Sequence, residues 1–398
     1  MRLHKSTSEA VIDALTEIFE NRRYADKVIE RILKSNPKWG SRDRKFIAET
    51  TYEMVRWWRL IQYLSGDFTI SSKQDYWSML GVWLIKNNIE LPSWNEFSRI
   101  NKKSVSEKLK KTTEFKITAS IPDWLDELGG AEIGNSWQAE MNALNKQASV
   151  VLRTNTLKVS KEKLKDSLAK DNVFTEEIEG YPDALVLNER SNVFRTFAFK
   201  KGWFEVQDGS SQLIADYLQL EPGMRVIDAC AGGGGKTLHV AAKLQNKGRI
   251  IAMDIEAWKL QELKKRAKRA GASTIETRLI ESSKTIKRLA NSADRLLLDV
   301  PCSGLGVLKR NPDAKWKLDL DFLERVQQTQ AEIIHSYSRM LKPGGLMVYA
   351  TCSILPSENR KQVDTFLANH SEFEFIEDRP VMPSEGFDGF YMAAMRKK

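Results

Sequence analysis

Along the first 120 residues, apolar side chains recur at the spacing of amphipathic helices. The pattern is carried by residues 10–24 (AVIDALTEIFENRRY), 24–35 (YADKVIERILKS) and 44–64 (RKFIAETTYEMVRWWRLIQYL). Pro37 and Gly40 interrupt it between the second and third stretches. We therefore expect an all-helical domain over residues 1–120, with the lysine-rich segment 101–111 as a surface loop or short helix.

Basic and aromatic residues alternate within this helical region, at Arg42, Arg44, Lys45, Arg56, Trp57, Trp58 and Arg59. Amphipathic helices produce such a pattern when the tryptophans lie in the core and the arginines reach into solvent. An RNA-contacting face would produce it as well. We favour the first interpretation and keep the second open.

The pattern becomes mixed between residues 121 and 205. A short helical piece (120–130) is followed by a strand pattern (148–158), a helix pattern (160–171) and a second strand pattern (183–189). The range 121–205 is therefore predicted to be a small α+β module.

Residues 206–398 alternate strand and helix regularly. Strands are predicted at 224–230 (MRVIDAC), 248–255 (GRIIAMDI), 274–280 (TIETRLI), 294–300 (DRLLLDV) and 345–352 (GLMVYATC). This alternation predicts a doubly wound, mostly parallel α/β sheet with helices on both faces. The last two segments, 373–378 and 388–398, are expected to form an antiparallel edge hairpin.

Composition narrows the class of protein. A chain of 398 residues predicts two or three domains, and a net charge of +9 favours a polyanionic partner such as nucleic acid. The apolar runs are too short to span a membrane, and acidic residues occupy the N-terminus where a signal peptide needs an apolar core. We expect a cytoplasmic monomer. Three cysteines without a CxxC pair predict neither a disulfide framework nor a metal site.

The stretch DACAGGGGKT (228–237) resembles two known phosphate-binding loops but fits neither. An ATP-binding P-loop ending in Gly235-Lys236-Thr237 requires glycine at position 230, which is Cys230. The dinucleotide pattern G-x-G-x-x-G requires a third glycine at position 237 or 238, and these are Thr237 and Leu238. Neither nucleotide triphosphate nor dinucleotide binding is therefore favoured.

An acid and glycines after the first strand, followed by an acid after the second, suit S-adenosylmethionine instead. Asp254 ends the second strand, where a carboxylate can accept hydrogen bonds from both hydroxyls of a ribose. Lys236 begins the next helix, whose free N–H groups favour a carboxylate. A plain glycine turn that packs helix on strand is the alternative.

The other two cysteines follow the fourth and fifth strands, in Asp299-Val-Pro-Cys302-Ser and Thr-Cys352-Ser. Ligands of open parallel sheets bind outside the carboxyl ends of the strands, so both thiols can enter one pocket beside the cofactor if these strands are neighbours. Methylation of a pyrimidine ring carbon needs this chemistry. A thiolate adds to carbon 6 and makes carbon 5 nucleophilic, an acid near N3 (Asp299) stabilises the adduct, and a second thiol can assist release.

These motifs, together with VQDGSSQ (206–212), LKPGG (341–345) and LPSEN (355–359), closely resemble the bacterial Sun/Fmu (RsmB)-type RNA cytosine-5 methyltransferases from about residue 121 to the end. The resemblance implies that Cys352 is the nucleophile and that Cys302 aids product release. It also implies cofactor contacts from Cys230, Ala231, Gly232, Gly233, Gly234, Gly235, Lys236, Asp254, Glu281 and Asp299. Residues 1–120 are similar to the helical domain of the antitermination factor NusB, and residues 121–205 to an RNA-recognition-motif-like insert.

Two departures from the family pattern occur in this sequence. Gly232-Gly233 replace the usual Ala-Pro, which makes the loop more flexible, and Glu281 replaces an aspartate.

The sequence thus predicts an S-adenosylmethionine-dependent RNA cytosine-5 methyltransferase that acts on ribosomal RNA, with the helical domain and a basic middle module gripping the RNA backbone. The alternatives are a transfer RNA cytosine-5 methyltransferase, a DNA cytosine-5 methyltransferase with Cys302 as nucleophile, and a non-catalytic RNA-binding assembly factor. The Glu-Asn-Val tripeptide of the DNA enzymes does not occur in the sequence.

Overall fold

A computed structural model describes residues 3–66 and 70–398 of the chain. These residues form two units, each with its own core. The first comprises residues 1–146 and 308–319, and the second comprises residues 147–307 and 320–398. The chain therefore leaves the second unit once, joins the first for twelve residues and returns.

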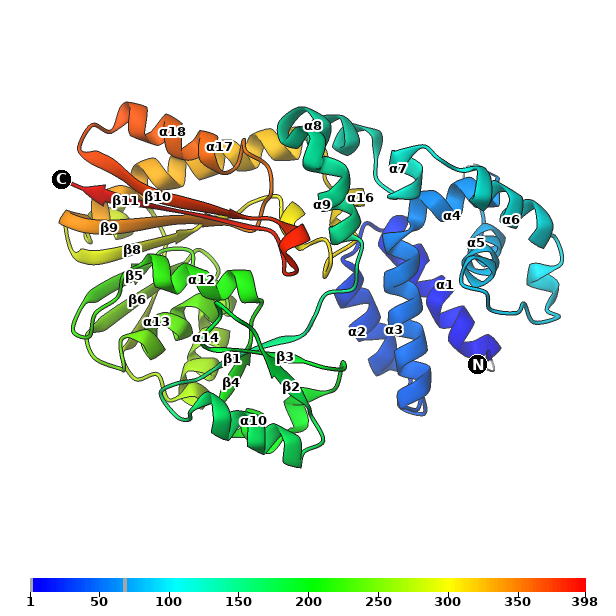
Figure 1. Cartoon of the computed structure of the whole chain (residues 1–398), viewed down its shortest axis with the longest axis horizontal. Coiled ribbons are helices and arrows are strands. Elements are labelled where there is room, and N and C mark those ends of the chain that lie inside the picture. The colour runs from blue at the N-terminus through cyan, green and yellow to red at the C-terminus, as the bar shows by residue number, and fades with distance from the viewer. Residues whose placement is uncertain (1–2, 67–69) are drawn as a thin grey trace. The chain divides into compact units, whose positions relative to one another are not determined.

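The first unit is helical, as the apolar spacing predicts (Figure 1). Its helices within the described residues are α1 (Lys5–Phe19), α2 (Ala25–Ser35), α3 (Ser41–Arg56), α4 (Trp58–Ser65), α5 (Lys73–Lys86), α6 (Lys102–Lys111), α7 (Phe115–Thr118), α8 (Asp123–Ile133), α9 (Trp137–Leu144) and α16 (Ala314–Lys317). The lysine-rich segment is the short helix α6. The stretch 121–146, expected to open the α+β module, lies in this unit as α8 and α9.

The tryptophans and arginines of α3 and α4 follow the core interpretation only in part. Trp58 is buried and stacks on Phe19 with ring centroids 3.6 Å apart. The expectation of solvated arginines is wrong for Arg56, which is 4% exposed. Its guanidinium donates to the carbonyls of Leu308 (3.3 Å) and Lys309 (3.0 Å). Burial of this charge is offset by carbonyl acceptors that come from far along the chain.

Residues 308–319 are fixed to the helices by further buried contacts. Lys315 is 1% exposed and donates from Nζ to the carbonyl of Arg56 (2.9 Å), while the indole of Trp316 donates to the carbonyl of Val55 (2.7 Å). The carboxylate of Asp313 accepts the backbone N–H of Ala25 at 3.0 Å. The segment is therefore an integral part of the helical unit.

The second unit contains a small α+β module and a large α/β domain. The module has a four-stranded sheet of order β2-β3-β1-β4, in which neighbouring strands are antiparallel. Helices α10 and α11 cover this sheet. The bounds are β1 (Val151–Thr154), α10 (Lys161–Lys170), β2 (Thr175–Glu177), β3 (Ala184–Leu187), α11 (Phe197–Lys200) and β4 (Phe204–Val206). Strands β2 and β4 were not predicted, because three residues are too few to show an alternating pattern.

The large domain is the predicted doubly wound fold. Its seven-stranded sheet within the described residues has the order β10-β11-β9-β8-β5-β6-β7. The strands are β5 (Arg225–Asp228), β6 (Arg249–Asp254), β7 (Ile275–Leu279), β8 (Ala293–Asp299), β9 (Leu341–Thr351), β10 (Phe373–Val381) and β11 (Phe390–Lys397). The five central strands from β9 to β7 are parallel, whereas β11 pairs antiparallel with both β9 and β10. The predicted edge hairpin is thereby confirmed.

Helices cover both faces of the large sheet (Figure 1). Alternating residues of the buried strands face opposite helical layers. Ile227 and Leu296 pack towards α17 (Leu320–Tyr337) and α18 (Arg360–Asn369). The intervening Val226 and Leu297 pack towards α12 (Gly209–Tyr217) and α13 (Gly235–Lys243). Helix α14 (Ala257–Ala270) packs beside α13. The strand order reverses between β5 and β8, and this switch point is where open α/β sheets bind ligands.

Candidate active site

The glycine loop between β5 and α13 adopts a backbone that requires glycine at two positions. Gly232 has φ +53° and Gly234 has φ +84°, in the left-handed region. A Cβ atom on Gly234 would lie 2.5 Å from Cγ of Leu263 in α14. Glycine at 234 therefore permits both the turn and the close packing of α14 against the start of α13.

Two arginines hold the carbonyl groups of this loop. Arg266 of α14 donates to the carbonyl of Gly233, and Arg153 of β1 donates to the carbonyl of Gly235, each at 2.7 Å. The carboxylate of Glu205, 3% exposed, pairs with Arg266 (2.9 Å) and with Arg269. Charged donors make strong hydrogen bonds, so this network fixes a loop that its glycines leave flexible. Sequence patterns did not reveal it, because its members come from three separate elements.

Asp228, at the end of β5, offers a buried acceptor to the site. Its Oδ2 accepts from the hydroxyl of Thr237 at 2.7 Å, while Oδ1 has no hydrogen-bond partner among the described residues. Burial raises the pKa of Asp228 to about 7, and the Thr237 hydroxyl and the nearby N–H of Cys230 offset this only in part. An unsatisfied buried carboxylate oxygen suits a cationic ligand group. The ammonium of S-adenosylmethionine is such a group, so the residues present fit this cofactor.

Asp254 lies beside the glycine loop, as its position at the end of β6 predicts. It is 7% exposed, and its two oxygens accept the backbone N–H groups of Gly232 and Glu256, both at 2.9 Å. Each carboxylate oxygen retains a lone pair that can accept from a ribose hydroxyl. These bonds also orient the carboxylate before any ligand arrives.

A cavity of about 480 Å³ opens beyond Asp254, past the ends of β6, β7 and β8. Its apolar lining comes from Ile255, Ile280, Ile286, Pro301 and Tyr337. This shape and chemistry suit a flat heterocycle such as adenine. One feature of the sequence indicates it, because an apolar residue, Ile255 or Ile280, directly follows the last residue of β6 and of β7.

Glu281 does not line this cavity, although Ile280 and Ser283 on either side of it do. Its side chain is exposed. The cofactor contact that the family resemblance implies for Glu281 stays a prediction.

The structure brings Cys302 and Cys352 together. Strands β8 and β9 are parallel neighbours, with Asp299 opposite Ala350, and the two sulfur atoms lie 3.3 Å apart. The hydrogen bond with Cys352, together with burial, raises the pKa of the Cys302 thiol well above its ordinary value.

Lys236 and Asp299 form an ion pair next to the thiols. Nζ of Lys236 lies 2.7 Å from Oδ2 of Asp299. Burial acts to lower the pKa of Lys236, but the charge and hydrogen bond of Asp299 outweigh it and raise the pKa. The charge of Lys236 also interacts with Cys352. A neighbouring cation favours the thiolate form of a cysteine.

Cys230 differs from the other two cysteines. Burial raises the pKa of its thiol, and the carboxylates of Asp228, Asp299 and Asp254 raise it further. A thiol in such a field is a poor nucleophile. Its place in the cofactor loop agrees with a packing role.

Two kinds of feature are absent from the described residues, metal-binding clusters and membrane-spanning helices. Residues 3–66 and 70–398 include no group of three or more His, Cys, Asp or Glu side chains that could hold a metal ion. Over the same residues, no helix is long and apolar enough to cross a membrane.

A doubly wound sheet with a glycine loop after β5, an acid after β6 and an acceptor for an ammonium group defines an S-adenosylmethionine-dependent methyltransferase. Comparison with known families agrees. The family of 16S rRNA methyltransferases RsmB/F matches residues 215–396, and the ferredoxin-like domain of RsmF/B-like methyltransferases matches residues 121–194.

Two relatives and one solved structure show how far the similarity extends. The chain is 31% identical to the probable ribosomal RNA small subunit methyltransferase B of Synechocystis sp. over 396 residues, covering 89% of this chain and 87% of that protein. It is 36% identical to the ribosomal RNA small subunit methyltransferase B of Yersinia enterocolitica, covering 70% of this chain and 66% of that protein. The alignment with the crystal structure of PH0851 covers 100% of this chain and 100% of that chain, with a TM-score of 0.85 and 24% identity. The chain belongs to the RsmB/F family, and the predicted fold is confirmed.

Proposed function

We propose that this protein methylates carbon 5 of a cytosine in ribosomal RNA. The observation that carries the proposal is the pair of thiols 3.3 Å apart at the ends of β8 and β9, beside the Lys236–Asp299 ion pair. The names of the relatives give ribosomal RNA as their substrate. An enzyme with this substrate would act in the cytoplasm.

The residues divide the chemistry between them. Cys352, as thiolate, adds to carbon 6 of the cytosine, and its new C–S bond moves electron density to carbon 5. Asp299 and Lys236 share protons next to the ring and stabilise the charge that develops at N3. S-adenosylmethionine, when bound, supplies the methyl group to carbon 5 and leaves as S-adenosylhomocysteine. A base must then take the carbon 5 proton. The electron pair of that C–H bond restores the double bond between carbons 5 and 6 and expels Cys352 as thiolate, and Cys302 assists that release.

The surroundings of the two thiols support this division of roles. Either sulfur can donate in the hydrogen bond that joins them, and that bond together with burial raises the pKa of Cys302. Cys352, which interacts with the charge of Lys236, is the better candidate for the nucleophile. A DNA-type enzyme would reverse this assignment.

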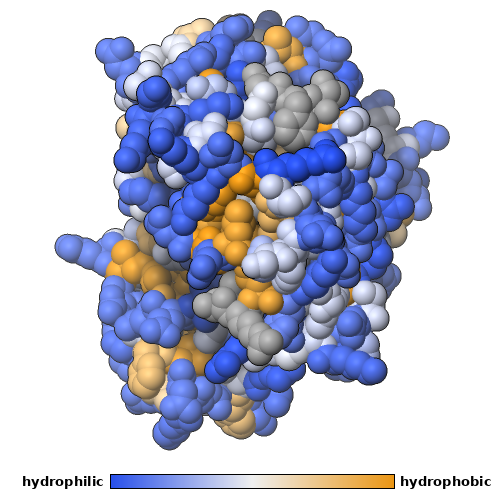
Figure 2. Space-filling model, turned by 90° about the vertical axis from the view of Figure 1, so that its right-hand side faces the viewer, coloured by the Kyte–Doolittle hydropathy of each residue, from blue (hydrophilic) through white to orange (hydrophobic). Residues whose placement is uncertain are grey.

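The charge distribution supports the N-terminal 120 residues as one RNA contact. They carry 22 Lys and Arg against 15 Asp and Glu, and residues 206–398 carry 29 against 24. The expected basic middle module is wrong, because residues 121–205 carry 11 Lys and Arg against 14 Asp and Glu. Figure 2 shows a face on which hydrophilic residues predominate around apolar patches. Attraction to the phosphate backbone should therefore come from residues 1–120 and 206–398 and not from the middle module.

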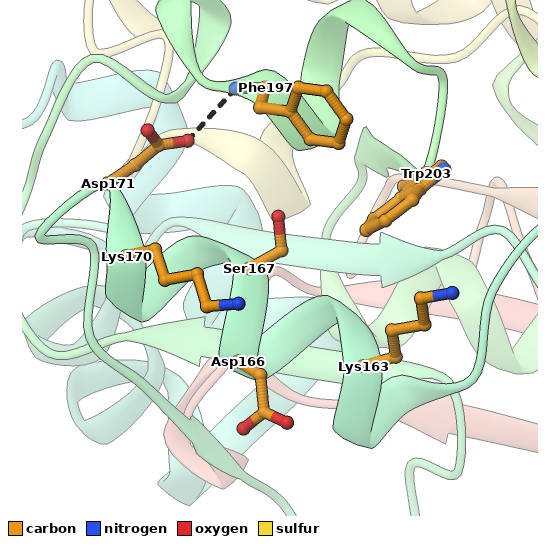
Figure 3. Close-up of a pocket in the computed structure, with 7 residues that line it drawn as sticks. All are labelled: Lys163, Asp166, Ser167, Lys170, Asp171, Phe197 and Trp203. Carbon is orange, nitrogen blue, oxygen red and sulfur yellow. Dashed lines mark hydrogen bonds between the residues drawn. The ribbon is translucent and has the colours of Figure 1, made fainter.

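The middle module offers one local feature that suits a single-stranded base. A pocket of about 420 Å³ lies between α10 and α11, lined by Lys163, Lys170, Phe197 and Trp203 among others (Figure 3). Phe197 is 51% exposed, and Nζ of Lys163 lies 5.5 Å over the ring of Trp203. Exposed aromatic rings beside lysines can stack a base and hold its phosphate.

Two cysteine variants test the proposed chemistry. Incubated with S-adenosylmethionine and ribosomal RNA, Cys352→Ala should lose methylation, because no adduct can form. Cys302→Ala should accumulate a covalent protein–RNA adduct, visible as a shifted band on a denaturing gel. If Cys352→Ala stays active and Cys302→Ala forms no adduct, the roles are wrong, as they would be in a DNA-type enzyme.

Two further measurements separate the remaining alternatives. Bisulfite sequencing of ribosomal and transfer RNA from a deletion strain identifies the RNA that loses 5-methylcytosine, and loss from transfer RNA alone would refute the ribosomal substrate. Absence of S-adenosylmethionine binding in calorimetry would favour an assembly factor without catalysis.

A further inference from the structure

Behind the two cysteines lies a carboxylate that is fully buried. Glu358, in the turn before α18, is 0% exposed, and the described residues give it no ion pair with a lysine, arginine or histidine. A buried carboxylate without a cation costs free energy unless hydrogen bonds satisfy it. Its hydrogen bonds therefore indicate what it is for.

All of the hydrogen bonds to this carboxylate come from donors around the two cysteine loops. Its Oε1 accepts the backbone N–H of Ser303 at 2.7 Å and the side-chain amide of Gln330 at 3.1 Å. Its Oε2 accepts the hydroxyls of both Ser303 and Ser353. Ser303 follows Cys302 and Ser353 follows Cys352, so one carboxylate bridges the residues that come directly after the two thiols.

Neighbouring groups support the same bridge. Gln330 of α17 also donates to the carbonyl of Pro301 (2.9 Å), directly before Cys302. The side chain of Asn359 donates to the carbonyl of Ser353 (2.9 Å), directly after Cys352. The phenol of Tyr349 in β9 donates to the carbonyl of Glu358 at 2.7 Å. Both cysteine loops are thus fixed from behind through a single buried centre.

We infer that Glu358 is a positioning residue that sets the distance between the two thiols. The inference rests on the proposed function, in which both cysteines act on one base. A pair of thiols that must act on one ring needs sub-ångström placement, and two separate loops would not hold it without such a bridge. Within the described contacts Glu358 makes no hydrogen bond with either sulfur, so its hold on their positions passes through Ser303 and Ser353, while its charge contributes to the raised pKa of Cys302.

Phenylarsine oxide provides a test of thiol placement that does not depend on catalysis. The arsenic forms two As–S bonds with two nearby thiols, and the oxygen leaves as water with both thiol protons, without oxidation or reduction. The wild-type pair, with sulfur atoms 3.3 Å apart, should bind it in a one-to-one complex measured by mass spectrometry. Cys302→Ala should not, which provides the control for capture by a single thiol.

Glu358→Gln keeps the shape but puts an amide N–H₂ where an oxygen accepted, and Glu358→Asp withdraws the carboxylate by one methylene. We expect each to weaken arsenical capture at least tenfold and to lower kcat tenfold or more, with the KM for S-adenosylmethionine within twofold of wild type. Ser357→Ala is the matched control in the same turn, since it removes a hydroxyl that accepts from the side-chain amide of Gln327 and leaves the Glu358 carboxylate in place. It should leave both readouts unchanged.

The outcomes separate the two proposals. Unchanged capture in both Glu358 variants overturns the positioning role, whether or not activity falls. Failure of the wild type to capture the arsenical overturns it too. Weakened capture in the Glu358 variants, together with a wild type that makes no 5-methylcytosine, would refute the proposed function and leave the bridge intact.

Discussion

The glycine loop and the two cysteine loops lie at the carboxyl ends of the same parallel sheet, but side chains of opposite charge hold them. Around the glycine loop, Arg153 and Arg266 donate to backbone carbonyls. Around the cysteines, the carboxylate of Glu358 accepts from a backbone N–H and two hydroxyls. The difference follows from what each loop must leave free.

A loop that binds an amino-acid cofactor must offer N–H groups to the ligand carboxylate, so its carbonyls are the groups available to the protein. A loop that presents a thiolate gains from a nearby positive charge such as Lys236. A positive anchor would compete with Lys236 for its carboxylate partner. A buried negative anchor behind the serines avoids this competition.

Among the variants that test this comparison, Gly234→Ala is expected to have the largest effect. The left-handed φ and the 2.5 Å approach to Leu263 should displace the loop, and we expect at least a hundredfold loss of S-adenosylhomocysteine affinity by calorimetry. Gly235→Ala is the matched control, because its Cβ would meet nothing closer than 3.9 Å. Equal losses in both variants would show that the left-handed turn is not what matters.

A smaller effect distinguishes the arginines that hold the glycine loop from Glu358, which holds the cysteine loops. Arg266→Ala removes a donor to the loop and should weaken cofactor binding about tenfold, the loss expected for a charged hydrogen bond. Arg269→Ala removes a cation from the same Glu205 but, in the described contacts, none from the loop, so it should weaken binding less than threefold.

Arsenical capture by the cysteines should be unchanged in both arginine variants. A fall in capture equal to that of Glu358→Gln would mean that the two anchors act as one network.

The pH dependence of cofactor binding should reveal Asp228. Its pKa of about 7 leaves the carboxyl largely neutral at pH 6 and charged at pH 8. Because only the charged form holds an ammonium well, affinity should rise severalfold over that range in calorimetry and level off above it. Asp228→Asn should flatten the profile.

The unliganded protein should show the opposite trend in stability. The folded-state pKa of Asp228 lies above the unfolded value of about 3.9, so the folded state binds the extra proton between pH 4 and 7. Stability from this group is therefore lost as pH rises through about 7. Thermal unfolding of Asp228→Asn should lack this contribution.

The smallest effects are expected from the two serines, and they test how much each serine contributes to the bridge between Glu358 and its cysteine loop. Ser353→Ala deletes one hydroxyl donor, whereas Ser303→Ala leaves the Ser303 backbone N–H in place. We expect each to lower kcat about threefold and Ser353→Ala to have the larger effect, measured by methyl transfer to RNA. A larger loss in Ser303→Ala would mean that its backbone contact is not sufficient.

The sequence predicted the features whose signal lies within one stretch of chain. The strand alternation located β5 to β9, and the acids and cysteines that end these strands indicated Asp254, Asp299, Cys302 and Cys352. Their convergence followed from the rule that parallel strands end at one edge. The sulfur distance confirms that Cys302 and Cys352 meet.

The anchors could not be predicted in this way, because each joins residues that are distant in sequence. Arg153 lies 82 positions before the carbonyl it holds, and Glu358 lies 55 positions after Ser303. The prediction that Arg56 is exposed to solvent was wrong for the same reason. Its helical spacing indicates a solvent-facing residue, but the carbonyls of Leu144, Leu308 and Lys309, all distant in sequence, give it buried acceptors.

Because residues 308–319 belong to the helical unit, neither unit corresponds to one continuous segment of the gene. A fragment starting at residue 147 would carry Lys315 and Trp316 without the carbonyls of Arg56 and Val55 that receive them. A fragment ending at residue 146 would leave the guanidinium of Arg56 without two of its acceptors. An exchange of the N-terminal region of this chain would therefore have to carry the twelve-residue insertion with it.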